Sequence, residues 1–156
     1  PSTLFAICVV SALGTGVMNL LLAIMVSMIP QFAMIVRSSV LTIKGSEFIE
    51  AAQCGGTSTA RIIMRHIIPN AMGPIIVQAT LALGGVILTA ASMGFIGLGV
   101  QPPEPEWGAI LTEGQEFMRD YPYLVIFPGV TIMMAVLECN FLGDGLRDAL
   151  DPKLKQ

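Results

Sequence analysis

The chain has 156 residues, of which 54% are hydrophobic and 12% are charged, and its mean hydropathy is +0.76. This composition excludes an ordinary soluble domain and is typical of a membrane protein. The net charge of −3, with only eight Lys and Arg residues, excludes a nucleic-acid-binding surface, which needs clustered positive charge.

The beginning of the chain and its cysteines give little sign of processing or cross-linking. The first residues, PSTLFAICVV, contain neither an initiator Met nor the basic region of a signal peptide. We therefore expect an N-terminally truncated part of a longer protein. Cys8, Cys54 and Cys139 are widely spaced, which indicates buried small side chains rather than a disulfide framework or a zinc site.

Four apolar stretches follow in chain order, and a membrane core about 30 Å thick requires about 20 helical residues. Residues 1–14 are uncharged but short, so they predict the end of a truncated span. Residues 18–36 predict a spanning helix with a kink at Pro30. Residues 75–97 predict a tilted span that ends among several glycines, and residues 123–142 predict the last one.

The charged connectors predict the orientation of these segments, because cytoplasmic loops collect Lys and Arg. Residues 44–69 and the residues just before them carry four basic side chains, and residues 147–156 carry three more. Residues 101–122 instead carry five acidic side chains and one Arg. We therefore expect a cytoplasmic loop at 44–69, a cytoplasmic tail and an external loop at 101–122.

Residues 47–70, EFIEAAQCGGTSTARIIMRHIIPN, form a polar segment that contains the only histidine. Residues 47–54 predict a short helix that ends at Gly55-Gly56, since glycine allows the left-handed conformation that ends helices. A hydroxyl side chain among residues 57–59 can cap a second helix. The segment is therefore predicted to be a helix-glycine-helix unit.

On the second helix of this unit, side chains four residues apart would share a face. Arg61 and Arg65 would form a cationic face, and Ile63 and Ile67 an apolar one. Pro69 would close the unit.

Two interpretations of the polar segment remain open on these residues. It is either an amphipathic helix on the lipid headgroups, or a surface that docks another protein. For docking, the small side chains of Ala51 and Ala52 permit close approach, and Glu50 selects an Arg or Lys on the partner.

The spacing of three elements in this segment resembles the EAA motif of permease subunits of binding-protein-dependent ABC importers. These elements are Glu50-Ala51-Ala52, Gly56 and His66-Ile67-Ile68-Pro69. Residues 95–108, FIGLGVQPPEPEWG, and 140–152, NFLGDGLRDALDP, look like the C-type subunit of dipeptide, oligopeptide and nickel importers.

The resemblance extends from about Leu13 to Pro152. Cys54 and Gly55 depart from it, because the family more often has a bulkier apolar residue at these positions.

The resemblance implies an all-α, polytopic transmembrane permease fold in the cell inner membrane. Two permease subunits would form the pathway, two cytoplasmic ABC ATPase subunits would bind the EAA loops, and an external solute-binding protein would contact the outer loop. The transported solute would be a peptide or a related small solute such as nickel. Family permeases have further helices before this chain starts, so we do not expect the chain to form a half-pathway alone.

The resemblance also implies roles for single residues in coupling to the ATPase. Glu50 would be the acidic contact, Ala51 and Ala52 the close-packing surface, and Gly56 the turn between the two short helices. The full set of implied coupling residues is Glu47, Glu50, Ala51, Ala52, Gly56, Arg61, Arg65, His66 and Pro69.

Catalytic and cofactor sites find no support in the sequence. A single histidine, His66, excludes a two-histidine metal site, and Gly55-Gly56 lacks the lysine of a phosphate-binding loop. We expect no enzyme activity, metal or cofactor in this chain, with ATP hydrolysed by a partner.

Glu138, inside the last span, would either snorkel to the interface or pair with the partner permease. The alternative function is a non-transporting membrane scaffold whose inner loop docks a cytoplasmic protein.

Overall fold

The computed structural model of the protein describes residues 2–150, which contain helices and no strand. Three of these helices are long and apolar enough to cross a membrane. They are α2 (Val17–Lys44), the continuous helix Thr59–Phe95, and α7 (Tyr123–Leu150). The predicted all-α membrane fold is confirmed. The end of the predicted cytoplasmic tail, residues 151–156, lies outside the described residues.

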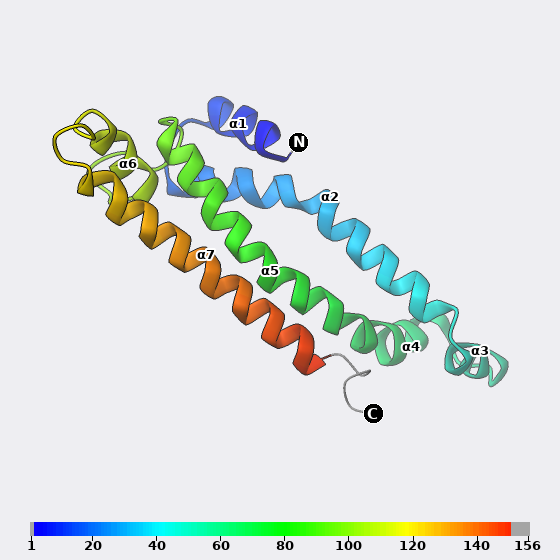
Figure 1. Ribbon diagram of the computed structural model, residues 1–156. Helices are drawn as coiled ribbons and strands as arrows, with labels where there is room; N and C mark the ends of the chain where they lie inside the picture. The colour runs from blue at the N-terminus through cyan, green and yellow to red at the C-terminus, as the bar shows by residue number, and fades with distance from the viewer. Residues whose placement is uncertain (1, 151–156) are drawn as a thin grey trace.

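The helices form an elongated bundle in which α5 (Ile68–Phe95) lies between α2 and α7 (Figure 1). The short helix α1 (Ser2–Leu13) packs against α2. At one end of the bundle, α6 (Trp107–Gln115) contacts both α5 and α7. At the other end lie α3 (Glu47–Cys54) and α4 (Thr59–Ile62). The loops predicted to be cytoplasmic and external are thus at opposite ends, while the side that each faces stays a prediction.

The larger of two buried apolar clusters joins the short helix α1 to the long helices α2 and α5. It consists of Ala6, Val10, Leu20, Ala23, Ile24 and Met93, from α1, α2 and α5. The chain reverses between α1 and α2 through Gly14 and Gly16, both at positive φ. There the side-chain amide of Asn19 donates to the carbonyl oxygens of Leu13 (2.9 Å) and Gly14 (3.2 Å). These bonds satisfy carbonyl groups that the end of α1 leaves free.

Glycines allow α5 and α7 to approach closely, as small residues do in membrane bundles. A Cβ added at Gly84 would lie 3.2 Å from Oδ1 of Asn140 and 3.3 Å from Cγ1 of Val136. A Cβ added at Gly143 would lie 2.5 Å from Cδ2 of Leu81. The glycines therefore set the register between the two helices, with position 84 beside 136–140 and position 143 beside 81.

Four hydroxyl side chains of α5 and α7 are satisfied within their own helix. Those of Thr80, Thr89, Ser92 and Thr131 each donate to the carbonyl oxygen four residues earlier, at 2.7–3.0 Å. A lipid environment offers no water to replace such bonds, so internal bonding makes these polar residues compatible with a span.

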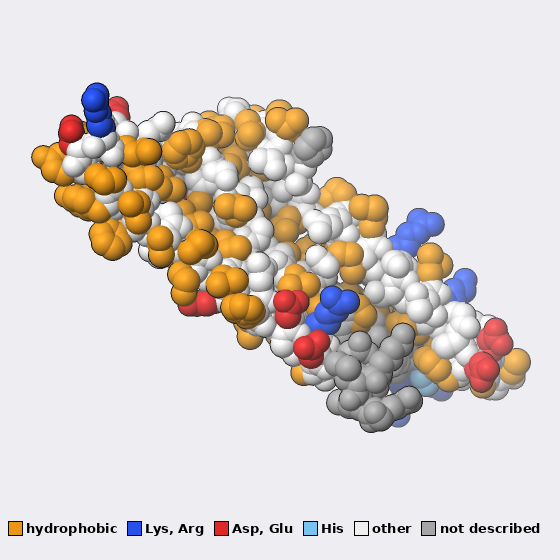
Figure 2. Space-filling view, viewed as in Figure 1, with side chains coloured by type: hydrophobic (Ala, Val, Ile, Leu, Met, Phe, Trp, Pro, Cys, Tyr) orange, Lys and Arg blue, Asp and Glu red, His pale blue; other side chains and the backbone are white. Residues whose placement is uncertain are grey.

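Exposed hydrophobic side chains dominate the surface around α6 and the adjoining part of α7, while charged side chains lie at both ends of the molecule and at the end of α7 (Figure 2). Large apolar side chains such as Phe127 and Phe141 are more than 60% exposed. A surface of this kind requires lipid or other membrane helices around it.

Candidate functional site

Helix α3 starts and ends at defined residues. Ser46 precedes it in an extended conformation, and its hydroxyl donates to the carbonyl oxygen of Ile43 at 2.5 Å rather than capping α3. Glu47 and Glu50 lie in the first turn, where a carboxylate interacts favourably with the helix dipole.

The end of α3 is a Schellman motif centred on Gly56. This residue has φ +72, the left-handed conformation that glycine adopts without strain. The N–H of Gly56 donates to the carbonyl oxygen of Gln53 (3.0 Å), and that of Thr57 donates to Ala52 (3.1 Å). The helix-glycine-helix arrangement predicted from the sequence is therefore present. Ser58 precedes α4, but its side chain makes no capping hydrogen bond.

Ile49 fastens α3 to the rest of the molecule. It is fully buried and forms the second apolar cluster with Ile62 and Ile67. Val40 and Ile43 of α2 pack against the same cluster. One isoleucine thus connects α3 both to the end of α2 and to the start of the long helix that contains α5.

The outer side of α3 is exposed among residues 2–150. Glu47, Glu50 and Ala51 are exposed, and Ala52 is partly buried. Phe48 is 47% exposed, and its ring lies 6.4 Å, centroid to centroid, from the ring of His66. An exposed aromatic ring is of the kind enriched at protein interfaces, and the exposed carboxylates can pair with basic side chains of a partner.

The second helix of the unit differs from the prediction, because it contains a π-helical turn, η1 (Ile63–Ile67). In this turn the N–H of Ile68 donates to the carbonyl oxygen of Ile63, five residues earlier. The predicted apolar face of Ile63 and Ile67 is therefore wrong. Ile62 and Ile67 are the buried pair, and Ile63 is 41% exposed. One residue more in the turn brings positions five apart onto one face.

Pro69 does not close the unit, contrary to the prediction. The helix continues from Thr59 to Phe95 through Pro69 and also through Pro74. Pro69 lies directly after η1 inside this continuous helix, where a proline removes one backbone hydrogen bond. The side chain of Asn70 donates to the carbonyl oxygen of His66 at 2.6 Å. The polar unit is thus the first part of a 37-residue helix.

The predicted coupling residues occupy one end of the molecule, but they do not form one compact cluster. Glu47, Glu50, Ala51, Ala52 and Gly56 lie on or next to α3, whereas Arg61, Arg65, His66 and Pro69 lie along the long helix. Arg61 and Arg65 are exposed, and His66 is partly buried. Sequence reasoning missed Ile49 and Ile62. Ile49 is one of only two large apolar side chains in helix 47–54, and this is the signal that could have identified it.

Truncation of Ile49 tests whether this cluster holds α3 in place. We expect Ile49→Ala to remove about 2–5 kcal/mol of docking free energy, because a fully buried side chain loses its contacts. Hydrogen exchange of residues 47–54 should then accelerate. Met64→Ala, at a position 69% exposed, is the matched control and should leave exchange unchanged. Equal exchange in the two variants would contradict the anchoring role.

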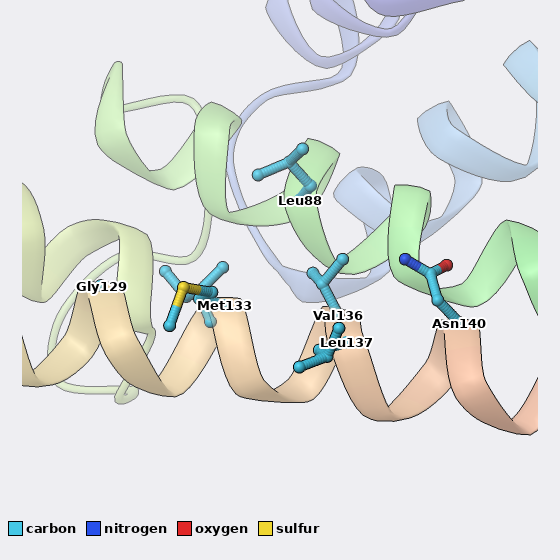
Figure 3. Close-up of a pocket in the computed structure, with 7 residues that line it drawn as sticks. Leu88, Gly129, Met133, Val136, Leu137 and Asn140 are labelled. Atoms are coloured by element: carbon cyan, nitrogen blue, oxygen red, sulfur yellow. The ribbon is translucent and has the colours of Figure 1, made fainter.

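Other regions of the described residues offer little chemistry. A groove of about 400 Å³ between α5 and α7 is lined by apolar side chains and Asn140. Figure 3 shows Leu88 on α5 and Met133, Val136 and Asn140 on α7 along this groove. Within residues 2–150, no group of three or more His, Cys, Asp or Glu side chains could hold a metal ion. Glu138 is exposed on α7, and its predicted snorkelling or pairing stays a prediction.

Comparison with known proteins gives close relatives along the whole chain. Residues 1–156 match the family described as binding-protein-dependent transport system inner membrane component. The dipeptide transport system permease protein DppC of Alkalihalophilus pseudofirmus is 51% identical over 155 residues, which are 99% of this chain and 51% of that protein. The glutathione transport system permease protein GsiD of Escherichia coli is 47% identical over 155 residues, which are again 99% of this chain and 51% of that protein. The chain spans about half the length of these curated relatives.

Proposed function

Because the chain belongs to the family of binding-protein-dependent transport system inner membrane components, we propose that it carries the segment of a permease subunit through which ATPase motion enters the membrane. The resemblance recognised in the sequence is confirmed by this family match. The chain is a multi-pass inner membrane protein of a transport permease family, not an ATPase.

The observation that carries the proposal is the attachment of α3 to the long helix. A force on α3 reaches Ile62 and Ile67 through the fully buried Ile49. Those two residues lie in the first turns of the continuous helix Thr59–Phe95, which runs into the middle of the bundle. Packed side chains and a rigid helix carry such a displacement better than a loop would.

Under this proposal, α3 binds a cytoplasmic ABC ATPase subunit. Glu50 contacts a basic side chain of the ATPase, and Ala51 allows the two backbones to approach. A second permease subunit completes the pathway, and alternating access of the two permeases moves the solute. An external solute-binding protein delivers that solute.

The names of the two relatives favour a peptide as the solute, rather than nickel. One relative is named a dipeptide permease and the other a glutathione permease, and glutathione is itself a small peptide. We therefore propose peptides of a few residues as the substrate class.

Replacement of Glu50 in the full-length subunit, assembled with its partners, tests the coupling role. We expect Glu50→Ala to lower peptide uptake and transport-coupled ATP hydrolysis about fivefold, since an exposed charged contact contributes about 1 kcal/mol. Arg37→Ala, also charged and exposed but on α2 and outside the set of coupling residues, is the control and should leave both rates unchanged. Normal uptake by Glu50→Ala at normal membrane levels would favour the scaffold alternative.

A further inference from the structure

The carboxylate of Glu106, just before α6, is turned inward against the end of α5. Its Oε2 accepts a hydrogen bond from the Val100 N–H at 3.1 Å. Its Oε1 is buried and has no hydrogen-bond partner among the described residues. Buried polar atoms without a partner are rare in proteins and require an explanation.

Two glycines make the space that this carboxylate fills. A Cβ added at Gly94 would overlap both carboxylate oxygens and lie 2.5 Å from the carboxyl carbon. A Cβ added at Gly99 would lie 2.5 Å from Oε2. The side chain of Glu106 therefore closes the segment Gln101–Glu106 onto α5 by filling a space that only glycines leave open.

Among residues 2–150, burial and the Val100 N–H are the influences on the Glu106 carboxyl, and no opposite charge, Arg119 of the same loop included, is among them. Helix α5 has no charged residue, and neither does the chain before Arg37. The nearest acidic residues in sequence are Glu104, on the same segment, and Glu113, on α6; Tyr123 is the first titratable residue of α7. Burial raises the pKa of the Glu106 carboxyl above its ordinary value, and the Val100 N–H only partly offsets this effect.

We propose that Glu106 is a proton-operated latch: the neutral carboxyl holds Gln101–Glu106 closed on α5, and the ionised carboxyl releases this segment into water. Oε1 explains this release. In the closed state it has no hydrogen-bond donor among the described residues, whereas water supplies donors to an ionised oxygen in the open state. The sequence predicts this segment on the external side, so the latch would respond to the pH outside the cell. It lies at the opposite end of the bundle from α3 and does not depend on the coupling role.

The direction of the pH effect follows from the two protonation equilibria. The closed state has the raised pKa, and the open state has the ordinary value, so the closed state binds the proton more tightly. Opening therefore becomes more favourable as the pH rises from the ordinary pKa of the open state to the raised pKa of the closed state. With one proton involved, the equilibrium constant for opening rises by up to about tenfold per pH unit in that window.

Hydrogen exchange of the Val100 amide reports directly on the latch, because this amide is the donor to Oε2. The measurement uses the full-length subunit in its assembled transporter, in lipid nanodiscs, from about pH 4.5 to pH 8, with rates corrected for intrinsic exchange. We expect protection of Val100 in the unmodified protein to fall by up to about tenfold per pH unit.

Three variants make the result decisive. Glu106→Gln, which remains neutral, should protect Val100 equally at every pH, and Glu106→Ala should leave it unprotected at every pH. Glu104→Gln, on the same segment but exposed, should follow the unmodified protein. Protection that does not change with pH in the unmodified protein, or that falls equally in Glu106→Gln, would overturn the proposal.

Discussion

Gly108→Ala is expected to leave little folded subunit, because α6 contacts α5 through the backbone at this position. A Cβ added at Gly108 would overlap the carbonyl oxygen of Ala91 and lie 2.9 Å from its carbonyl carbon. Neither group is the end of a flexible side chain, so α6 as a whole must move away. Thr112 would then lose its hydrogen bond to the carbonyl oxygen of Phe95, which is 2.7 Å long. We expect a loss of about 3 kcal/mol or more.

The stability of the Gly108 variant is measured as the yield of monodisperse subunit after detergent extraction and as its thermal unfolding midpoint. Gly85→Ala provides the matched control, since Gly85 lies inside α5 and a Cβ there meets nothing within 4 Å. It should be neutral or stabilising by up to about 1 kcal/mol. If both variants give the same yield and midpoint, the close contact between α6 and α5 does not exist.

Gly56→Ala is expected to reduce peptide uptake about tenfold without loss of subunit from the membrane. Gly56 has φ +72, and alanine in this left-handed region costs about 1–2 kcal/mol. Relief of that strain would disrupt the Schellman motif that ends α3 and change the direction of α3 relative to the long helix. Because the variant residue lies at an exposed turn, the membrane helices should fold normally.

The neighbouring glycine gives the control for this prediction. Gly55 has φ −73, which alanine adopts readily, and a Cβ there would make only ordinary contact with the carbonyl oxygen of Ala51 at 3.4 Å. Gly55→Ala should therefore transport at the normal rate. Peptide uptake and coupled ATP hydrolysis are measured side by side for the two variants. Equal transport by both would mean that the conformation of Gly56 does not matter for coupling.

Hydropathy was sufficient to predict the apolar part of each long helix, because a membrane span depends on length and apolar composition alone. The helix that ends before Gly56 was also predictable, since the turn chemistry of glycine is local. The buried face of the second helix was not predictable. The prediction assumed positions four apart, but η1 puts Ile62 and Ile67 together, and the sequence has no local signal for a π turn.

The inward position of Glu106 was also beyond sequence reasoning. It lies in the stretch QPPEPEWG, whose prolines and acidic residues are typical of an exposed loop. Its partial burial depends on the approach of α6 to α5, which Gly108 permits, and on the space that Gly94 leaves for its carboxylate. Tertiary contacts between segments more than ten residues apart therefore decide what this side chain does, and local patterns do not contain that information.

The π turn also has a consequence for changes in chain length. It accommodates one residue more than an α-helical turn, and the isoleucines on either side of it still share a face. A relative with one residue fewer between positions 62 and 67 would place the same two isoleucines four apart, on one face of an ordinary α-helix. Single-residue deletions in this turn thus preserve the contact with Ile49, whereas deletions elsewhere in the long helix would rotate α3 by about 100° around the bundle.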